Sequence, residues 1–333
     1  MSNWVQSVLK SSPVIKRFSG NPVLAAKDVP NDATLIFNAG VTKYQGKYVM
    51  MFRNDYNYTK QGPFGFEGTN IGLAYSNDGI LWEVQSKQCF RLEDKEIIRV
   101  YDPRLTVMDG KCYLCFAVDT RHGLRGGIAV TEDFEEFEVL SMSVPDNRNM
   151  VLFPERIYGK YIRLERPFPV YSRGGKDRFD IWISDSPDLQ YWGNSKLLLT
   201  VEDVPFANDK IGPAAPPIKT SEGWLTTFHA VDLDPSRGKN GWEDVWKKRY
   251  TAGLMLLDLE DPSKIIGIYK EPLIAPETKY EKDGFRNDVI FPGGMILEDN
   301  GEVKIYYGAA DTVECLASAD VNDLINLCKP GRG

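Results

Sequence analysis

The chain has 333 residues, of which 42% are hydrophobic, and its 40 lysines and arginines are outnumbered by 47 aspartates and glutamates. The net charge of −7 argues against nucleic acid as a general partner, and no apolar run approaches the roughly 18 residues of a membrane-spanning helix. The N-terminus lacks the apolar stretch of a signal peptide, and the five cysteines are an odd number, so we expect a cytoplasmic protein with free thiols.

Along the chain, one pattern of strand, tight turn and strand occurs five times. The five segments are 41–55, 105–119, 155–167, 218–232 and 295–311. Each has a glycine at its turn, and these glycines are Gly46, Gly110, Gly159, Gly223 and Gly301. Glycine accepts the positive φ angle that tight hairpin turns require, so the segments predict five β-hairpins.

A second element follows each hairpin, in which an apolar strand runs into a polar turn. These elements are 71–84, 126–140, 179–193, 252–266 and 314–327. Four strands per repeat give about twenty strands, and helical periodicity is confined to short stretches such as 320–328. We therefore predict an all-β five-bladed β-propeller as a single domain over residues 1–333, with a short N-terminal extension at 1–20. A β-sandwich is the alternative, but fivefold repetition favours the propeller.

In a propeller, the first strand of each blade lines a central channel, so the beginnings of these strands meet at one mouth. The polar residues expected there are Asn38, Arg53, Asp55, Asp102, Asp119, Arg166, His229, Asp288 and Asp311. Carboxylates, arginines and a histidine around an axial pocket are typical of a sugar- or anion-binding site.

Asp102 is the best candidate for a catalytic acid. It could simply cap the turn before Pro103, but its place at the start of an inner strand directs it toward the channel. Cleavage of a glycosidic bond requires an acid that protonates the leaving oxygen. The sequence contains no G-x-S-x-G, P-loop or G-x-G-x-x-G motif. With only two histidines in the chain, we predict no metal site.

A set of basic residues is expected near the same mouth. It consists of Arg148, Arg166, Lys210 and His229. Arg166 could instead pair with Glu165. If the four converge, however, they would hold a dianion such as phosphate through charge-assisted hydrogen bonds.

These features resemble glycoside hydrolase family 130, which consists mostly of inverting β-mannoside phosphorylases with a five-bladed propeller fold. The stretches FNAGV, YDPR, NRNMVLFPER, LERP, KIGP, FHAV and IYYGAADT occur in the family's order, and the resemblance covers residues 20–327. It implies that Asp102 is the sole protein acid and acts through the 3-hydroxyl of the −1 mannose. Phosphate, a co-substrate, then attacks C1 to give α-mannose 1-phosphate, and no cofactor is needed.

The resemblance also implies which residues bind the two substrates. The residues expected to bind phosphate are Arg148, Arg166, Lys210, His229 and Tyr250. The residues expected to hold the −1 mannose are Asn38, Arg53, Asp55 and Asp311, with Tyr101, Asp119, Asp180 and Asp288 as further substrate-binding candidates. The expected partners are a β-mannoside and phosphate, and the resemblance allows a homo-oligomer.

Two segments depart from the pattern of family members that cut β-1,4-mannosides. Segment 168–180 reads FPVYSRGGKDRFD where those members carry GHTPFGD, and segment 234–250 is long and contains tryptophans. Both would shape the +1 site, with Tyr171, Arg173, Trp242 and Trp246 as candidate contacts. This favours β-1,2-mannobiose as substrate. The alternatives are a β-1,4-mannosyl phosphorylase and a sugar-binding propeller without catalytic activity.

Overall fold

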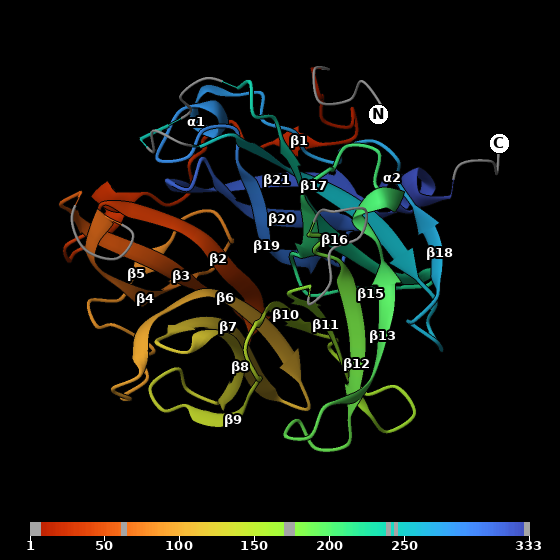
Figure 1. The fold of residues 1–333 in the computed structure, drawn as a ribbon, viewed down its shortest axis with the longest axis horizontal. Helices are drawn as coiled ribbons and strands as arrows, with labels where there is room; N and C mark the ends of the chain where they lie inside the picture. The colour runs from red at the N-terminus through yellow and green to blue at the C-terminus, as the bar shows by residue number, and fades with distance from the viewer. Residues whose placement is uncertain (1–7, 61–64, 170–176, 238–240, 243–245, 330–333) are drawn as a thin grey trace.

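The computed structural model describes residues 8–60, 65–169, 177–237, 241–242 and 246–329. Within them, 21 strands form five antiparallel sheets that surround a central axis as the blades of a propeller (Figure 1). The predicted fold is therefore confirmed. No helix in this part of the chain is long and apolar enough to cross a membrane.

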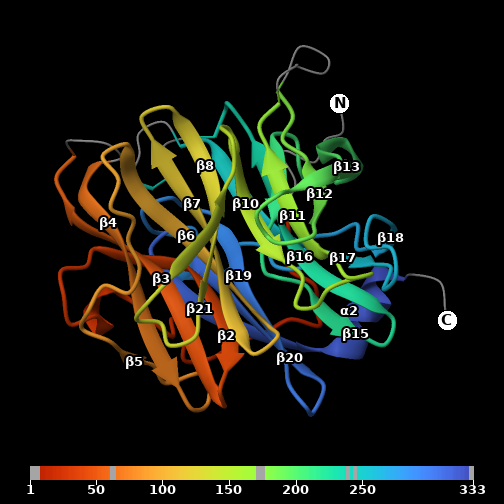
Figure 2. The same cartoon turned by 90° about the horizontal axis from the view of Figure 1, so that it is seen from below.

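The first three blades each contain four strands in sequence order. The first blade comprises β2 (Leu35–Tyr44), β3 (Lys47–Tyr58), β4 (Phe66–Ser76) and β5 (Glu83–Val84). The second comprises β6 (Ile97–Met108), β7 (Lys111–Thr120), β8 (Gly123–Thr131) and β9 (Glu138–Met142). The third comprises β10 (Asn147–Leu152), β11 (Tyr161–Pro167), β12 (Ile181–Ser186) and β13 (Gly193–Leu199). The first two blades lie side by side in Figures 1 and 2.

The last two blades depart from this simple order. The fourth comprises β14 (Lys210–Pro213), β16 (Gly223–Leu233), β17 (Lys248–Leu257) and β18 (Ile265–Ile268), and the short β15 (Ile218–Thr220) also pairs with β16. The fifth comprises β19 (Ile290–Leu297), β20 (Glu302–Ala309), β21 (Val313–Asp320) and β1 (Lys16–Arg17). Strand β1 lies within the predicted extension 1–20, so part of this segment pairs with β21 and closes the last blade.

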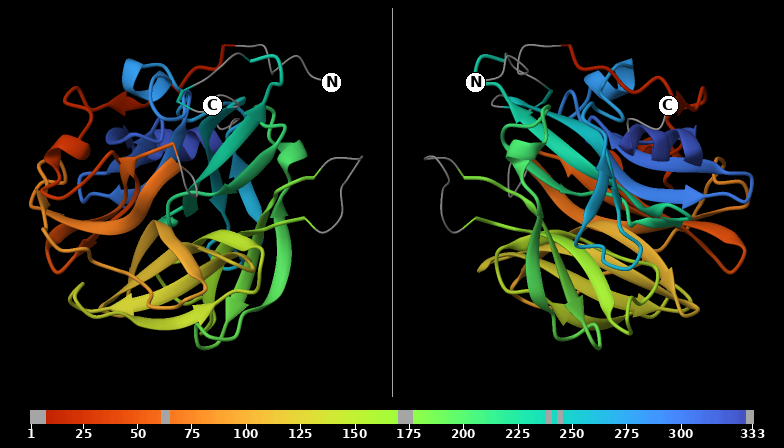
Figure 3. Two further views of the ribbon diagram at one scale, coloured as in Figure 1. Left: turned by 60° about the vertical axis from the view of Figure 1, so that its left-hand side comes forward. Right: turned by 90° about the vertical axis from the view of Figure 1, so that its right-hand side faces the viewer.

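In the described part of the chain, helical structure is limited to short segments. Helix α1 (Lys279–Lys282) precedes β19, and helix α2 (Val321–Cys328) follows β21, where the sequence shows helical periodicity. Two short 3₁₀ turns lie at Ala26–Asp28 and Val201–Asp203. The Asp320 side chain caps α2 by accepting a hydrogen bond from the Asn322 amide. Buried Leu324, Ile325 and Cys328 pack α2 against the last two blades. Figure 3 shows the C-terminal helix lying beside the strands of the last blade.

The repeated sequence pattern produces repeated packing. The five predicted turn glycines all have positive φ angles. In three blades, a phenylalanine of the second strand lies opposite a glycine of the third, as in the pair Phe52 and Gly72. A Cβ atom at Gly72 would lie 2.3 Å from the Phe52 ring, so the ring occupies the space of the missing side chain.

The polar outer turns also share one hydrogen-bond pattern. Ser76, Thr131 and Ser186 each accept a hydrogen bond from the amide three residues later, at 2.8–2.9 Å. Such hydroxyl contacts stabilise turns between strands. The repeat seen in the sequence therefore corresponds to one local structure used in three blades.

Candidate active site

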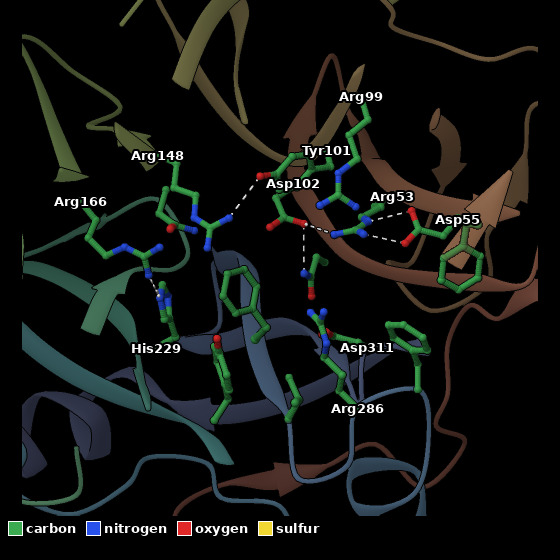
Figure 4. A pocket seen from close by; sticks show the side chains of 17 residues that line it. Arg53, Asp55, Arg99, Tyr101, Asp102, Arg148, Arg166, His229, Arg286 and Asp311 are labelled. Atoms are coloured by element: carbon green, nitrogen blue, oxygen red, sulfur yellow. Dashed lines mark hydrogen bonds and ion pairs between the residues drawn. The ribbon is translucent and has the colours of Figure 1, made fainter. Parts of the chain in front are cut away.

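A pocket lies at one mouth of the channel, where residues from all five blades meet. Its lining consists of Asn38, Arg53, Asp55, Phe66, Arg99, Tyr101, Asp102, Arg148, Asn149, Arg166, His229, Tyr250, Phe285, Arg286, Val289, Phe291 and Asp311 (Figure 4). Five arginines and three carboxylates in one pocket match a polar, anionic or hydroxyl-rich ligand better than an apolar one.

Bulges in the inner strands present three of these side chains. Asn38 in β2, Asp102 in β6 and Asn149 in β10 have φ angles of 54°, 52° and 57°. At each position the pairing register with the next strand shifts. A bulge redirects a side chain, and asparagine and aspartate tolerate the left-handed conformation better than most residues. The three blades therefore present one polar side chain each at equivalent places.

Asp102 is the least tightly paired carboxylate of the pocket. Its Oδ1 accepts a hydrogen bond of 3.1 Å from Asn38 Nδ2 and lies 3.6 Å from Arg53 Nη1. In contrast, Asp55 lies 2.6 Å from Arg53, and Asp311 lies 3.2 Å from Arg286. Asp102 is therefore the carboxyl group most available for chemistry.

The other two carboxylates are fixed by arginines. Both oxygens of Asp55 accept hydrogen bonds from Arg53, and Oδ1 also accepts one from the Thr69 hydroxyl at 2.6 Å. Burial alone would raise the pKa of Asp55, but the charge and hydrogen bonds of Arg53 hold it below its usual value. Burial raises the pKa of Asp311, although Arg286 opposes this shift. Ionised Asp55 can therefore accept hydrogen bonds from sugar hydroxyls.

Basic groups gather on the side of Asp102 opposite Arg53 and Asp55 (Figure 4). Arg148 Nη1 donates to the Tyr101 hydroxyl at 3.2 Å, and Arg166 Nη1 donates to His229 Nε2 at 3.0 Å. Burial, with repulsion from Arg148, lowers the pKa of Arg166 to about 9. Burial and the neighbouring cations also hold the pKa of His229 well below its usual value, so its ring is neutral.

Lys210 lies next to this basic group without lining the pocket. Its Nζ is 5.4 Å from the centre of the Tyr250 ring. Burial, together with Arg166 and Lys248, lowers its pKa well below the usual value. Burial also raises the pKa of Tyr250 to about 12. Among the described residues, neither Arg148, Arg166 nor Lys210 forms an ion pair with a carboxylate.

The structure brings most of the predicted site residues together. Those that line the pocket are Asp102, Arg148, Arg166, His229, Tyr250, Asn38, Arg53, Asp55, Tyr101 and Asp311. Of the residues predicted to bind phosphate or the −1 mannose and of the further substrate-binding candidates, four do not line it: Lys210, Asp119, Asp180 and Asp288.

Each of these three aspartates forms hydrogen bonds without lining the pocket. Asp119 lies behind the pocket wall, where its carboxylate pairs with Arg99 at 2.6 Å and accepts from the Tyr101 hydroxyl at 2.9 Å. Asp180 accepts a hydrogen bond from the Val201 amide. The Asp288 carbonyl accepts one from the Tyr250 amide. All three aspartates therefore have partners within the protein, and the partners of Asp119, which are Arg99 and Tyr101, line the pocket.

The two tryptophans predicted for the +1 site differ in exposure. Trp242 is 42% exposed and packs against Tyr58 and Phe285, whereas Trp246 is buried, stacks on Tyr250 and donates to the Asn287 carbonyl. Neither tryptophan lines the pocket, but Trp242 packs on Phe285 and Trp246 on Tyr250, and both of these partners line it. Tyr171 and Arg173 lie outside the described residues.

Seven lining residues were not predicted from the sequence. They are Phe66, Arg99, Asn149, Phe285, Arg286, Val289 and Phe291. Asn149 could have been found, because RNMVL aligns with FNAGV and YDPRL and thereby places Asn149 at the bulge position of the repeat. Arg286 lies in the loop between α1 and β19, for which the repeated sequence pattern makes no prediction. Among the described residues, no group of three histidine, cysteine, aspartate or glutamate side chains could hold a metal ion.

Comparison with known proteins shows which family this chain matches. Residues 9–330 match glycoside hydrolase family 130, described as beta-1,4-mannooligosaccharide phosphorylase. The 1,2-beta-oligomannan phosphorylase of Thermoanaerobacter sp. is 31% identical, with 93% of this chain and 98% of the relative covered. The beta-1,4-mannooligosaccharide phosphorylase of Ruminococcus albus is also 31% identical, with 98% and 94% covered.

A solved structure of a related protein has the same fold. The beta-1,2-mannobiose phosphorylase of Listeria innocua, in complex with beta-1,2-mannobiose, superposes with a TM-score of 0.79 at 27% identity. The match covers 95% of this chain and 99% of that protein. The resemblance deduced from the sequence motifs is therefore confirmed over nearly the whole chain.

Proposed function

Because this chain belongs to glycoside hydrolase family 130, we propose that it catalyses the inverting phosphorolysis of β-mannosides. The substrate that we favour is β-1,2-mannobiose, which with phosphate would give α-mannose 1-phosphate and mannose. The reaction needs no cofactor, because phosphate itself is the nucleophile and no base is required to activate water.

The observation that supports phosphorolysis best is the buried basic group without a carboxylate partner. Arg148 and Arg166 are at the pocket wall, and the Nε atom of each is buried without a hydrogen-bond partner among the described residues. Buried charges are costly unless they are paired. A phosphate dianion would supply the missing negative charge and accept several charge-assisted hydrogen bonds. A hydrolase would have no use for this group.

The proposed mechanism uses one protein acid. Asp102 gives its proton to the 3-hydroxyl of the −1 mannose, and this hydroxyl passes its own proton to the glycosidic oxygen as the C1–O bond breaks. A phosphate oxygen attacks C1 from the opposite face with its electron pair, which forms the new C1–O bond and inverts the anomeric centre. Asp102 remains as a carboxylate, stabilised by Asn38 and Arg53.

Phosphate dependence tests this proposal directly. Incubation of β-1,2-mannobiose with the enzyme should release mannose only when phosphate is present, and the rate should saturate with phosphate concentration. Sulfate at the same ionic strength is the control, because it fills the anion site without giving a stable sugar ester. Release of two mannose molecules at the same rate without phosphate would show a hydrolase instead.

The linkage is supported by the two segments that differ from the β-1,4-specific pattern, 168–180 and 234–250. Overall identity does not discriminate, because a 1,2-beta-oligomannan phosphorylase and a beta-1,4-mannooligosaccharide phosphorylase are equally similar. A β-1,2 acceptor lies sideways relative to a β-1,4 acceptor, so the +1 walls must differ while the −1 site is kept. Trp242, in the second segment, is 42% exposed and packs on the lining residue Phe285, so it is our candidate for stacking on the acceptor.

Reverse phosphorolysis tests the linkage. With α-mannose 1-phosphate and mannose, we expect a β-1,2-linked disaccharide, identified by two-dimensional NMR of the purified product. Glucose and N-acetylglucosamine serve as alternative acceptors, and we expect both to react more slowly than mannose. A β-1,4-linked product, or a preference for glucose, would reject the β-1,2 assignment and leave phosphorolysis intact.

A further inference from the structure

Arg104 is a buried arginine on the propeller axis, two residues after Asp102. It is 3% exposed and does not line the pocket. Its Nε donates to the Ala214 carbonyl at 2.7 Å, and its Nη1 donates to the carbonyls of Pro103 at 2.7 Å and Asn38 at 3.3 Å. One guanidinium thus binds the backbone of the first, second and fourth blades.

Two of the three carbonyls lie at the bulges of the inner strands. Asn38 is the bulged residue of β2, and Pro103 follows the bulged Asp102 in β6. Both bulges have positive φ, a strained conformation that persists only when surrounding contacts hold it. Asn38 and Asp102 are also hydrogen-bonded to each other. Two contacts of Arg104 therefore hold the backbone that presents the proposed acid and its partner, and the third ties this backbone to Ala214 in the fourth blade.

Other groups at the axis support the same backbone. The guanidinium of Arg104 lies 5.1 Å from the centre of the Phe291 ring, and Phe291 lines the pocket. The Ala39 amide, next to Asn38, donates to the fully buried Glu314 at 3.1 Å. Gly40 brings β2 within van der Waals distance of β6, since a Cβ there would lie 2.9 Å from the Arg104 Cα. The bulged backbone at Asn38 and Asp102 is therefore held by the close packing of β2 on β6 and by the Arg104 guanidinium.

We propose that Arg104 is a positioning residue: it touches no substrate, its contacts with the Asn38 and Pro103 carbonyls fix the bulges that present Asp102 and Asn38 to the pocket, and its contact with Ala214 anchors the guanidinium to the fourth blade. Arginine suits this role because its planar group offers five donors in a fixed arrangement, whereas lysine offers one ammonium that cannot reach three separate strands. The inference rests on the proposed function, because it concerns the residue proposed as acid.

The test compares Arg104→Lys with Arg17→Lys. Arg17 also holds a backbone carbonyl, that of Ala275, and pairs with Glu281, but it lies in the edge strand β1 of the last blade. We expect both variants to lose thermal stability. Arg104→Lys should lower kcat by about 100-fold, the size of effect that a misplacement of about 1 Å produces. Its KM for phosphate should stay within about threefold, and Arg17→Lys should keep its kcat within the same range.

Activity alone does not decide the inference, so a crystal structure of Arg104→Lys is the second measurement. We expect Asp102 or Asn38 to leave the positive φ region, with loss of the hydrogen bond between them. Unchanged bulges, or a kcat within threefold of the wild-type value, would overturn the inference. If the wild-type enzyme turned over no mannoside, the proposed function would fail, while the two structures would still decide the role of Arg104.

A crystal structure of the wild-type protein covers the case in which Arg104→Lys does not fold. In that structure the guanidinium should lie within hydrogen-bond distance of the Ala214, Pro103 and Asn38 carbonyls. A guanidinium that contacts none of the three would overturn it.

Discussion

Replacing Asp102 with asparagine should lower kcat for β-mannobiose phosphorolysis by about 10³-fold, within the usual range for loss of a general acid. Asparagine keeps the size of the side chain and tolerates the positive φ of 52° at this bulge, so the pocket should keep its shape. It cannot release a proton to the sugar. Mannobiose binding, measured by calorimetry, should therefore change far less than turnover.

Asp109→Asn is the matched control for this experiment. Asp109 lies in the hairpin turn at the other end of β6, also has a positive φ, and is far along the strand from the pocket lining. Its replacement should leave kcat unchanged. Full turnover by Asp102→Asn would remove the acid assignment and make Asp311 the next candidate, because burial raises the pKa of this pocket carboxyl group whereas Arg53 lowers that of Asp55.

Replacing Arg166 with alanine should raise the KM for phosphate by roughly 10- to 150-fold, the equivalent of about 1.5–3 kcal/mol for one charge-assisted contact. Arg166 is fully buried at the pocket wall, and no carboxylate among the described residues pairs with it. Lys210→Ala should act in the same direction with a smaller effect, because Lys210 lies beside Tyr250 and does not line the pocket. Steady-state kinetics with phosphate varied at saturating mannobiose measure both.

Two comparisons separate phosphate binding from folding. Binding of mannobiose without phosphate should be nearly unchanged in both variants, since the −1 group around Arg53 and Asp55 is intact. Arg156→Ala, which removes an exposed arginine paired with Asp109, should leave both KM values unchanged. Equal losses for the two substrates in Arg166→Ala would indicate a structural role for Arg166 instead.

The sequence predicts the fold well because its signals are local and repeated. The turn glycines, the apolar strands and the polar outer turns each depend on neighbouring residues, and all three appear as predicted in the structure. Helix α2 and the place of Asp102 on an inner strand follow in the same way. Part of the N-terminal segment, by contrast, pairs with β21 about 300 residues away, and no local sequence pattern predicts such a pairing.

The site is less predictable because its geometry depends on contacts between blades. Asp119 was expected in the pocket from its place at the end of a strand, but the side chains of Arg99 and Tyr101 lie between it and the pocket. Trp246 was expected to face a ligand, yet it stacks on Tyr250. Arg286 lies in a loop, and only the packing of that loop brings it to Asp311. The sequence predicts where a strand ends. It does not predict which side chains pack between a residue at that end and the pocket.

The most direct test of the proposed reaction is the identity of its first product. β-1,2-Mannobiose, phosphate and the enzyme are followed together by ³¹P and ¹H NMR from the first minutes. Phosphorolysis with inversion predicts that inorganic phosphate declines as α-mannose 1-phosphate and one equivalent of mannose appear at equal rates. A constant phosphate signal with two equivalents of free mannose, or a β-linked sugar phosphate, would contradict the proposed reaction.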